Sequence, residues 1–522
     1  MKEVLLKGLR FKMKTNVANT SANNENEKLQ AELSLRKIKN LNSAVVTGTA
    51  VDPGLIPNNS CAQIPANTFR RTPNKTRPID KNKVASLMAT EWENFKKLTA
   101  ASGRESAIAK ITTPLGVTSS FQYWDPHPIS IQSARGAWMT DADGRKLLDL
   151  SMGFGAMLVG HLNPVVVKEM QSALDSGMLF VMPSPISRDA AERICKRFNI
   201  DQVRFANSGT EATMYATRIA RAITGKFGIV KVEGGYHGSY DEFTVSAKPA
   251  LDKAGDPENP TPVSTLGVNA QDVYVVPFNN LPALERMFEK HQKDIACFIV
   301  EPVLENLGIV LPDAGYLQGV RDLCDKYGII LIFDEVKTGL TAGPQGASQK
   351  LGVTPDLITL AKSIGGGAPV AAFGGKKEFM DAVTDGRMAH FGTFNGNPLA
   401  MAGVRAVDMV ATPEALASAT ALNIDALNRI SDIIDNYELP AHTVGFGVKG
   451  CVTWRENPVR NYRDYKASDF EVAELSWLWS LNRNIITPPG LDEQWLVSLA
   501  HTKEEMDILV NDFEDLAKAL RD

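Results

Sequence analysis

The sequence lacks the features that mark membrane, secreted and nucleic-acid-binding proteins. It has no run of 18 or more apolar residues, so no membrane span is expected, and its basic start contains no apolar stretch long enough for a signal peptide. Five cysteines lie scattered without a CxxC pair or metal-ligand spacing, which favours a reducing, cytoplasmic compartment. The formal net charge of −4 gives no basic field for nucleic acid.

What the chain does contain is a large apolar fraction, 44% of 522 residues, enough for a large core. Residues 1–80 stand apart because they are polar and have few periodic apolar positions, which predicts a polar N-terminal arm that is disordered or that extends over a partner subunit. Apolar steps of three and four residues predict a helix from about Asn82 to Ala109. We assign residues 81–160 to the N-terminal segment of a small domain, 161–412 to a large domain and 413–522 to a C-terminal small domain.

In the predicted large domain, helical segments alternate with short apolar runs. These runs are Val203–Ala206, Gly228–Val232, Val273–Val276, Cys297–Val300, Gly328–Phe333 and Leu357–Ala361. Such alternation predicts an α/β fold with a mostly parallel sheet flanked by helices. Before this domain, alternating residues on both sides of Asp143-Gly144 predict a β-hairpin.

The most informative residues are Asp334 and Lys362. Asp334 directly follows the apolar run Gly328–Phe333, and Lys362 lies 28 residues later, before three glycines that let backbone approach a ligand closely. Open parallel sheets bind their ligands at the carboxyl ends of strands. A carboxylate for a pyridinium nitrogen and a lysine for a Schiff base are what pyridoxal 5'-phosphate (PLP) requires from a protein. Taken singly, such an aspartate is usually a helix cap and such a lysine is usually solvated.

The turn Asn207-Ser208-Gly209-Thr210-Glu211 follows a predicted strand and opens a predicted helix. Its hydroxyl and backbone N–H groups, together with the positive end of the helix, suit a phosphate. The same residues also form an ordinary capping box with Glu211. The two interpretations are compatible.

Three further segments carry polar or aromatic residues after predicted strands. Tyr236 and His237 lie among glycines, where an aromatic ring has clearance to stack on a planar ligand, although a Gly-rich turn with an aromatic plug is the simpler alternative. Asn306 lies shortly after the strand that ends at Val300. The segment around Thr393 has a hydroxyl and two amides and, by itself, is most simply a polar loop.

Together, six motifs resemble, in this order, those of the class III aminotransferases of fold type I, and most closely the glutamate-1-semialdehyde 2,1-aminomutase branch. The motifs are NSGTEA, GGYHGS, EPVLENLG, IFDEVKTG, LAKSIGGGAPVAAFGG and GTFNGNPLAMAG. Two C-terminal segments, Pro458–Asp464 and Ser498–Thr502, resemble that branch as well. The resemblance runs from about Thr113 to the end of the chain. It implies a large domain with a mostly parallel seven-stranded sheet flanked by helices, and a smaller α+β domain.

The resemblance also implies a role for each matching residue. Lys362 would carry the cofactor as a Schiff base and then move a proton, and Asp334 would keep the pyridine nitrogen protonated. The remaining cofactor contacts would come from Tyr236 and Val336 on the two ring faces, His237, Asn306 near the phenolic oxygen, Ser208, Gly209 and Thr210 at the phosphate, and Thr393 at the phosphate of the neighbouring subunit. A site shared in this way implies a homodimer.

The chain departs from the aminomutase branch in the segment that meets the substrate. Gln122 stands where that branch has an arginine for the substrate carboxylate, and glutamine cannot form a bidentate charged pair. Losing such a contact costs about 1.5–3 kcal/mol. Glu493, in contrast, matches a carboxylate that the branch retains near its gate. We therefore predict a substrate pocket that includes Ser119, Gln122, Phe154 and Glu493.

Aromatic residues are frequent around the same pocket. Phe121, Tyr123, Trp124 and Phe154 predict a larger, more apolar pocket, or they are simply core residues. An amino donor such as alanine or glutamate still needs a partner for its carboxylate, and Arg387, close to the Thr393 segment, is a candidate.

We therefore predict a PLP-dependent aminotransferase that moves an amino group from an amino donor to an aldehyde or ketone acceptor through a lysine aldimine and pyridoxamine phosphate. Two alternatives stay open. One is an intramolecular isomerase such as the 2,1-aminomutase, against which Gln122 speaks. The other is a non-catalytic PLP-binding relative, against which the intact Lys362 and Asp334 speak. We expect small-molecule amine and carbonyl substrates, a homodimer with shared active sites, and neither a nucleic-acid nor a membrane partner.

Overall fold

The computed structural model describes residues 65, 68–264, 267–488 and 494–522. The chain divides into two units, Met1–Asn59 and Ser60–Asp522. The first unit lies outside the described residues, so the arm predicted for residues 1–80 stays a prediction there. The second unit holds all the described helices and strands.

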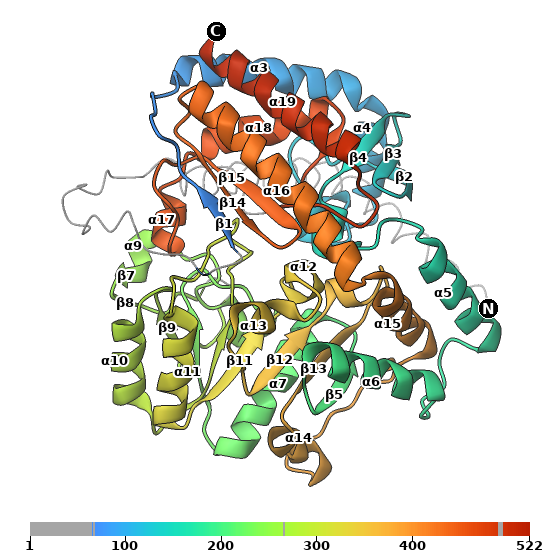
Figure 1. Ribbon diagram of the computed structural model, residues 1–522, viewed down its shortest axis with the longest axis vertical. Coiled ribbons are helices and arrows are strands. Elements are labelled where there is room, and N and C mark those ends of the chain that lie inside the picture. Colours follow the sequence, from blue (N-terminus) through green and yellow to red (C-terminus); the bar gives the residue numbers. More distant parts are fainter. Residues whose placement is uncertain (1–64, 66–67, 265–266, 489–493) are drawn as a thin grey trace, which may run out of the picture. The chain divides into compact units, whose positions relative to one another are not determined.

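A seven-stranded sheet forms the centre of the second unit, in the order β5-β13-β12-β11-β10-β6-β9 (Figure 1). Its strands are β5 (Gln202–Ala206), β6 (Gly228–Val232), β9 (Val273–Val276), β10 (Ile295–Val300), β11 (Ile330–Asp334), β12 (Leu357–Leu360) and β13 (Ala371–Gly375). All pairs from β12 to β9 are parallel, and β13 is antiparallel to both of its neighbours. The predicted fold class, an α/β fold with a mostly parallel sheet, is confirmed.

Helices cover both faces of this sheet because successive residues of its strands point in opposite directions. Phe298 and Val300 of β10 pack into one apolar cluster with residues of α10 and α11, whereas Cys297 and Ile299 pack into another with residues of α7. A strand buried on both faces reads as a continuous apolar run. The helices of this layer are α5 (Pro164–Ser176), α6 (Pro185–Phe198), α7 (Gly209–Thr224), α10 (Leu281–His291), α11 (Tyr316–Tyr327), α14 (Lys377–Thr384) and α15 (Pro398–Val410).

Two four-stranded sheets form a second layer, in the orders β1-β14-β15-β17 and β16-β4-β3-β2. Their strands are β1 (Phe69–Arg71), β2 (Ile131–Arg135), β3 (Trp138–Asp141), β4 (Lys146–Asp149), β14 (His442–Phe446), β15 (Lys449–Thr453), β16 (Ile485–Ile486) and β17 (Trp495–Leu496). β1 falls within the range predicted as an arm and pairs antiparallel with β14. The predicted hairpin is confirmed, since β3 and β4 pair antiparallel across Asp143-Gly144.

Longer helices pack in this second layer, and several short elements lie in the connections between the main strands and helices (Figure 1). The longer helices are α3 (Lys81–Leu98), α4 (Ala100–Ala109), α16 (Pro413–Asn436), α18 (Phe470–Asn482) and α19 (Lys503–Arg521). The short elements are α8 (Asp241–Thr244), α9 (Leu251–Ala254), α12 (Gly339–Ala342), α13 (Gly346–Leu351), α17 (Tyr462–Lys466), the two-residue strands β7 (Gly255–Asp256) and β8 (Asn259–Pro260), and 3₁₀ turns at Pro114–Gly116, Ser120–Gln122, Met152–Gly155 and Lys362–Ile364.

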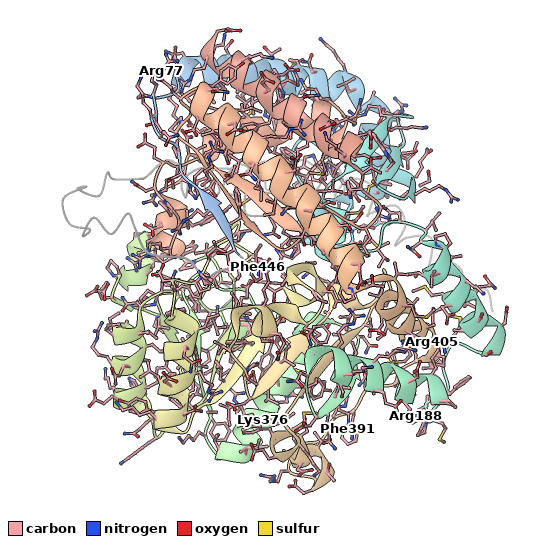
Figure 2. The ribbon with its side chains drawn as sticks, in the orientation of Figure 1. Arg77, Arg188, Lys376, Phe391, Arg405 and Phe446 are labelled. Atoms are coloured by element: carbon pink, nitrogen blue, oxygen red, sulfur yellow. The ribbon has the colours of Figure 1, made fainter. Side chains whose placement is uncertain are left out.

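The turn between β14 and β15 joins the two layers by packing against α12. Gly447 in this turn has φ +61°, and a Cβ atom there would overlap the carbonyl oxygen of Thr341, so the close approach requires glycine. The amide of Val448 donates to the same oxygen at 3.0 Å. Phe446, labelled in Figure 2, packs into an apolar cluster with residues of α12 and α13.

The described residues contain no helix that is long and apolar enough to cross a membrane. In the same part of the chain, no group of three His, Cys, Asp or Glu side chains is placed to hold a metal ion. Cys297 and Cys324 are free and buried.

Candidate active site

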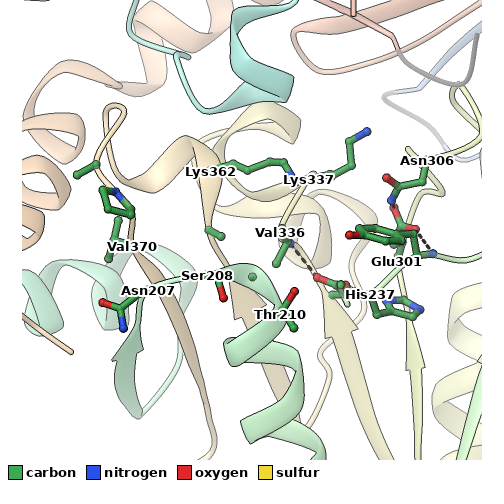
Figure 3. A pocket seen from close by; sticks show the side chains of 17 residues that line it. Asn207, Ser208, Thr210, His237, Glu301, Asn306, Val336, Lys337, Lys362 and Val370 are labelled. Carbon is green, nitrogen blue, oxygen red and sulfur yellow. Dashed lines mark hydrogen bonds and ion pairs between the residues drawn. The ribbon is translucent and has the colours of Figure 1, made fainter. Parts of the chain in front are cut away.

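A cavity of about 260 Å³ lies at the strand ends of the large sheet (Figure 3). Its walls come from the turns that follow β5, β6, β10, β11 and β12, so segments far apart in sequence meet there. Nine of the predicted site residues line it: Ser208, Gly209, Thr210, Tyr236, His237, Asn306, Asp334, Val336 and Lys362.

One wall is the N-terminus of α7. Ser208 caps this helix: its side-chain oxygen accepts from the amide of Glu211 at 3.2 Å, and Glu211 accepts in return from the amides of Asn207 and Ser208. A Cβ atom on Gly209 would lie 2.9 Å from Val336, so this helix end approaches the opposite wall more closely than a larger residue allows. The hydroxyl of Ser208 keeps its own proton to donate. The turn thus offers backbone and hydroxyl donors to an anion.

Asp334 ends β11 and is buried, with three donors on its carboxylate. His237 lies 2.8 Å from Oδ2, while the hydroxyl of Thr359 and the amide of Val336 donate to Oδ1 at 2.9 and 3.1 Å. Burial lowers the pKa of His237 even though the carboxylate opposes the shift. The Nδ1–H of the imidazole donates to Asp334. These donors fix the carboxylate in one orientation at the cavity wall.

Lys362 begins a short 3₁₀ turn directly after β12. Its backbone has φ +45°, a conformation that residues other than glycine adopt at a cost and that persists where the surroundings impose it. The side chain lines the cavity, as does that of Lys337 from the segment after β11 (Figure 3). The ammonium group of Lys337, however, donates to the main-chain carbonyl of Glu305.

Glu301, at the end of β10, forms a further acidic part of the wall. Its Oε2 accepts from the side-chain amide of Asn306 at 2.9 Å and from the main-chain amide of Glu305 at 3.0 Å. Burial, helped by the nearby Asp334, raises the pKa of Glu301 to about 7. This carboxyl group orients Asn306 within the cavity.

Comparison with known proteins identifies the family. A sequence profile of the class-III aminotransferases matches residues 121–467. The chain is 38% identical to a glutamate-1-semialdehyde 2,1-aminomutase of Methanocorpusculum labreanum, across 78% of this chain and 97% of that protein. It is 36% identical to one of Salinibacter ruber, across 76% and 92%. The chain belongs to the class-III aminotransferases.

Solved structures of two relatives share the fold of this aminotransferase. An omega-transaminase from Sphaerobacter thermophilus is 31% identical, with a TM-score of 0.78 over 82% of this chain and 99% of that one. A glutamate-1-semialdehyde aminomutase from Pseudomonas aeruginosa PAO1, in complex with PMP, is 25% identical, also with a TM-score of 0.78, over 85% and 99%. Both transaminase and aminomutase structures are therefore neighbours.

The cofactor of this family is PLP, and the residues of the cavity fit that group. The donor set at α7 suits its phosphate, the fixed carboxylate of Asp334 suits its pyridinium nitrogen, and the amine of Lys362 suits its carbonyl carbon. Tyr236 and Val336 supply the flat and branched side chains that a planar ring needs on its faces.

Some predicted residues of the aminotransferase lie outside the lining of this cavity. Thr393 is exposed. Ser119 and Gln122 build their own turn, in which the amide oxygen of Gln122 accepts from Thr118 and from the amide of Ser119 at 2.8–3.2 Å. Phe154 is half-buried and also outside the lining. Glu493 lies outside the described residues.

An aromatic contact connects these segments to the cavity. The ring of Phe121 lies 5.8 Å from that of Phe154 and 6.1 Å from that of Tyr236, which lines the cavity. Tyr123 and Trp124, in contrast, contact Asp125 and Trp477 respectively, and neither lines the cavity.

Charged residues of the wall were missed by the sequence reasoning. Glu301 directly follows β10, so the strand-end signal used for Asp334 was available for it as well, and Lys337 lies within the motif IFDEVKTG without having been assigned a role. Arg387 forms an ion pair with Asp385 at 2.7 Å and does not line the cavity. Among the described residues, no arginine lines it.

Proposed function

We propose that this chain is a PLP-dependent aminotransferase that moves an amino group from an amino donor to an aldehyde or ketone acceptor. The observation that carries the proposal is the meeting of Lys362, Asp334 and the capped N-terminus of α7 in one cavity. The family of the chain supports the same chemistry.

Bound PLP supplies an electron sink for the electrons of the bond that breaks at the amine-bearing carbon. The amine of Lys362 would hold the cofactor covalently and would move a proton at the amine-bearing carbon of the substrate. Asp334, held by His237 and Thr359, would keep the pyridine nitrogen protonated. Tyr236 and Val336 would flank the ring, and Ser208, Gly209 and Thr210 would bind the phosphate.

The proposed substrate side of the site includes Ser119, Gln122 and Phe154, and Glu493, which lies outside the described residues, stays a predicted member of it. Support comes from Phe121, whose ring contacts both Phe154 and Tyr236. Gln122 is uncharged, and its amide oxygen is bound within its own turn. It therefore offers no positive charge to a substrate carboxylate. Acceptors without the carboxylate of glutamate 1-semialdehyde, such as longer aldehydes and ketones, therefore suit the pocket best.

The enzyme acts as a homodimer in which Thr393 of one chain reaches the phosphate bound by the other. Thr393 is exposed and does not line the cavity of its own chain. Its neighbours Phe391 and Phe394 expose 82% and 60% of their surface (Figure 2 labels Phe391). Exposed large apolar side chains of this kind mark protein interfaces.

The cytoplasm is the proposed compartment, and small amines and carbonyl compounds are the proposed partners. Buried free thiols at Cys297 and Cys324 are in keeping with a reducing compartment. Recovery of the enzyme outside the cytosolic fraction after cell fractionation would argue against this compartment.

An intramolecular amino exchange is the second candidate, because relatives 36–38% identical carry the name glutamate-1-semialdehyde 2,1-aminomutase. The glutamine at position 122 argues against it, since that substrate carries a carboxylate. A non-catalytic role is the third candidate and has the least support, because the lysine, the carboxylate and the helix N-terminus are all in place.

The two lysines of the cavity provide the test of the proposed attachment. Borohydride reduction of the PLP-loaded protein, followed by peptide mapping, should place the cofactor on Lys362. Lys362→Ala should lose both the covalent label and amine transfer, whereas Lys337→Met should keep the label on Lys362. A label on Lys337, or amine transfer by Lys362→Ala at the wild-type rate, would contradict the proposal.

A further inference from the structure

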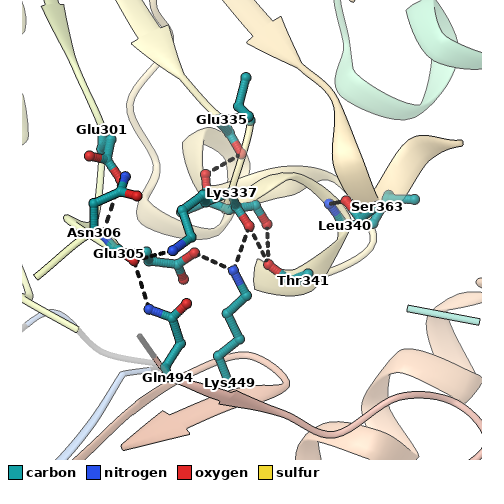
Figure 4. Close-up of polar contacts among 12 residues, drawn as sticks. Glu301, Glu305, Asn306, Glu335, Lys337, Leu340, Thr341, Ser363, Lys449 and Gln494 are labelled. Atoms are coloured by element: carbon teal, nitrogen blue, oxygen red, sulfur yellow. Dashed lines mark hydrogen bonds and ion pairs between the residues drawn. The ribbon is translucent and has the colours of Figure 1, made fainter. Parts of the chain in front are cut away.

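Lys449 begins β15 and is almost fully buried, with 1% of its surface exposed. Its ammonium group lies 2.6 Å from Oε2 of Glu305, which is itself fully buried, and donates to the carbonyl of Lys337 at 2.8 Å (Figure 4). Lys449, from the second layer, thus bonds the two segments that follow β10 and β11 of the large sheet.

Both of these segments carry residues of the active site. Glu305 immediately precedes Asn306, and its amide donates to Glu301 at 3.0 Å. Its carbonyl accepts from Nζ of Lys337 and from the side chain of Gln494, the latter at 2.7 Å (Figure 4). The ion pair therefore holds the wall that contains Glu301 and Asn306 against the segment after Asp334.

The aliphatic stem of Lys449 lies close to a third segment. A Cβ atom built on Gly155 would lie 3.6 Å from Cε of Lys449 and 3.5 Å from Leu496. Gly155 ends the turn Met152–Gly155, which carries Phe154. A single side chain from β15 therefore bonds the segments of Asn306 and of Val336 and lies beside that of Phe154.

Stability alone does not explain a charged pair at this place. Two charges lose their hydration on burial, so apolar residues of similar size often fold at least as well. Oε1 of Glu305 is buried and has no hydrogen-bond partner within the described residues, so the carboxylate is not fully compensated. Unlike an apolar contact, the ion pair fixes the relative positions of the two segments, because charge-assisted hydrogen bonds fix both distance and angle.

We propose that Lys449, through its ion pair with Glu305, is a positioning residue that fixes the geometry of the cofactor cavity. It does not contact the reacting atoms. It sets the distance between the Asn306 wall and the Val336 segment, and the proposed function places the cofactor ring against Val336. The inference rests on that function for the identity of the group between these walls.

The test uses a double variant, Lys449→Met/Glu305→Leu, because Lys449→Met alone leaves an unpaired buried carboxylate and can fail to fold. The double variant keeps the backbone bonds of residue 305 and should unfold at a temperature close to that of the wild type. Arg197→Met is the matched control, since it removes a cation from the ion pair with Asp408, and neither residue lines the cavity.

Three readouts are compared at a temperature where all proteins are folded: the dissociation constant of PLP, the visible absorbance of the bound cofactor, and kcat and KM for amine transfer. We expect weaker PLP binding, a shifted absorbance and a fall in kcat of up to about 100-fold in the double variant, since displacements of about 1 Å can have that effect. The control should keep the wild-type values.

Two results would overturn the inference. One is a double variant with wild-type PLP affinity, absorbance and kinetics. The other is a control that loses them to the same extent. A wild-type protein that binds PLP without transferring nitrogen would instead contradict the proposed function and leave the comparison of PLP affinities intact as a test of positioning.

Discussion

Lys231 is fully buried in β6, and its ammonium group donates to three main-chain carbonyls. The oxygens of Val245, Gly235 and Phe243 lie at 2.6, 2.8 and 3.2 Å from Nζ. These carbonyls bracket the segment that carries Tyr236 and His237. The side chain of Lys231 therefore holds both ends of the loop that carries Tyr236 and His237. Its amine is removed from water in doing so.

That burial predicts a pH dependence. Burial lowers the pKa of Lys231 from 10.5 to about 7, so between these values the unfolded chain binds more protons at this residue than the folded chain does. This residue therefore makes stability rise with pH across that window, by at most about 1.4 kcal/mol per pH unit. Lys231→Met should lose this contribution. Urea unfolding of both proteins at several pH values between 7 and 10 measures it.

The comparison between the two proteins cancels the other groups that titrate in the same window. The difference in unfolding free energy between wild type and Lys231→Met should grow with pH in favour of the wild type. A difference that stays constant from pH 7 to 10 would show that Lys231 keeps its ordinary pKa in the folded chain.

At the scale of single elements, α7 carries the clearest link between local sequence and site. The capping box of Ser208 and Glu211 was expected from the sequence, and the hydrogen bonds of both side chains are present. A related cap occurs at Ser184, the residue before α6: its amide donates to the hydroxyl of Ser187 at 3.2 Å, and the two hydroxyls lie 2.9 Å apart. Ser184 does not line the cavity.

Variants at these two caps can distinguish a structural role of Ser208 from a role in binding the phosphate. Ser208→Ala and Ser184→Ala should each cost about 0.5–2 kcal/mol of stability, the usual loss for an N-cap serine. Ser208→Ala should in addition weaken PLP binding by about 1.5–3 kcal/mol, because a hydrogen bond to a charged phosphate is lost. Thermal unfolding and titration with PLP measure the two effects, and equal PLP affinities in both variants would remove Ser208 from the phosphate site.

Other elements depart from their sequence patterns for identifiable reasons. β13 was missed because its five residues include two alanines and two glycines, and only its place between β12 and β5 makes it a strand. The helix expected from Asn82 to Ala109 is divided at Thr99, whose hydroxyl donates to the carbonyl of Phe95 at 2.6 Å and lies 3.0 Å from His127. Contacts distant in sequence decide both cases.

Contacts between distant parts of the chain limit how much of the site could be predicted from the sequence. Residues at strand ends, such as Asp334 and Lys362, follow from the alternation of strands and helices, because parallel strands bring their carboxyl ends to one edge. The pair of Glu305 and Lys449 does not, since 144 residues separate its members and no local pattern relates them. A charged residue in an apolar segment reveals its partner only in the folded chain.

Assembly belongs to the same scale. If the proposed homodimer shares its sites, then Phe391→Glu/Phe394→Glu should shift sedimentation from twice the mass of one chain to the mass of a single chain. PLP binding should weaken at the same time, because Thr393 would no longer reach the neighbouring phosphate. A monomeric wild-type protein with full amine transfer would contradict the shared site.

The most direct test of the central claim is the visible absorbance of the PLP-loaded protein before and after excess alanine or glutamate, with the keto acid assayed in the same sample. An aminotransferase should lose the band of its lysine-bound cofactor and release about one keto acid per site. A band that persists with every amino donor, or that changes while no keto acid is released, would contradict intermolecular transfer and favour the intramolecular exchange.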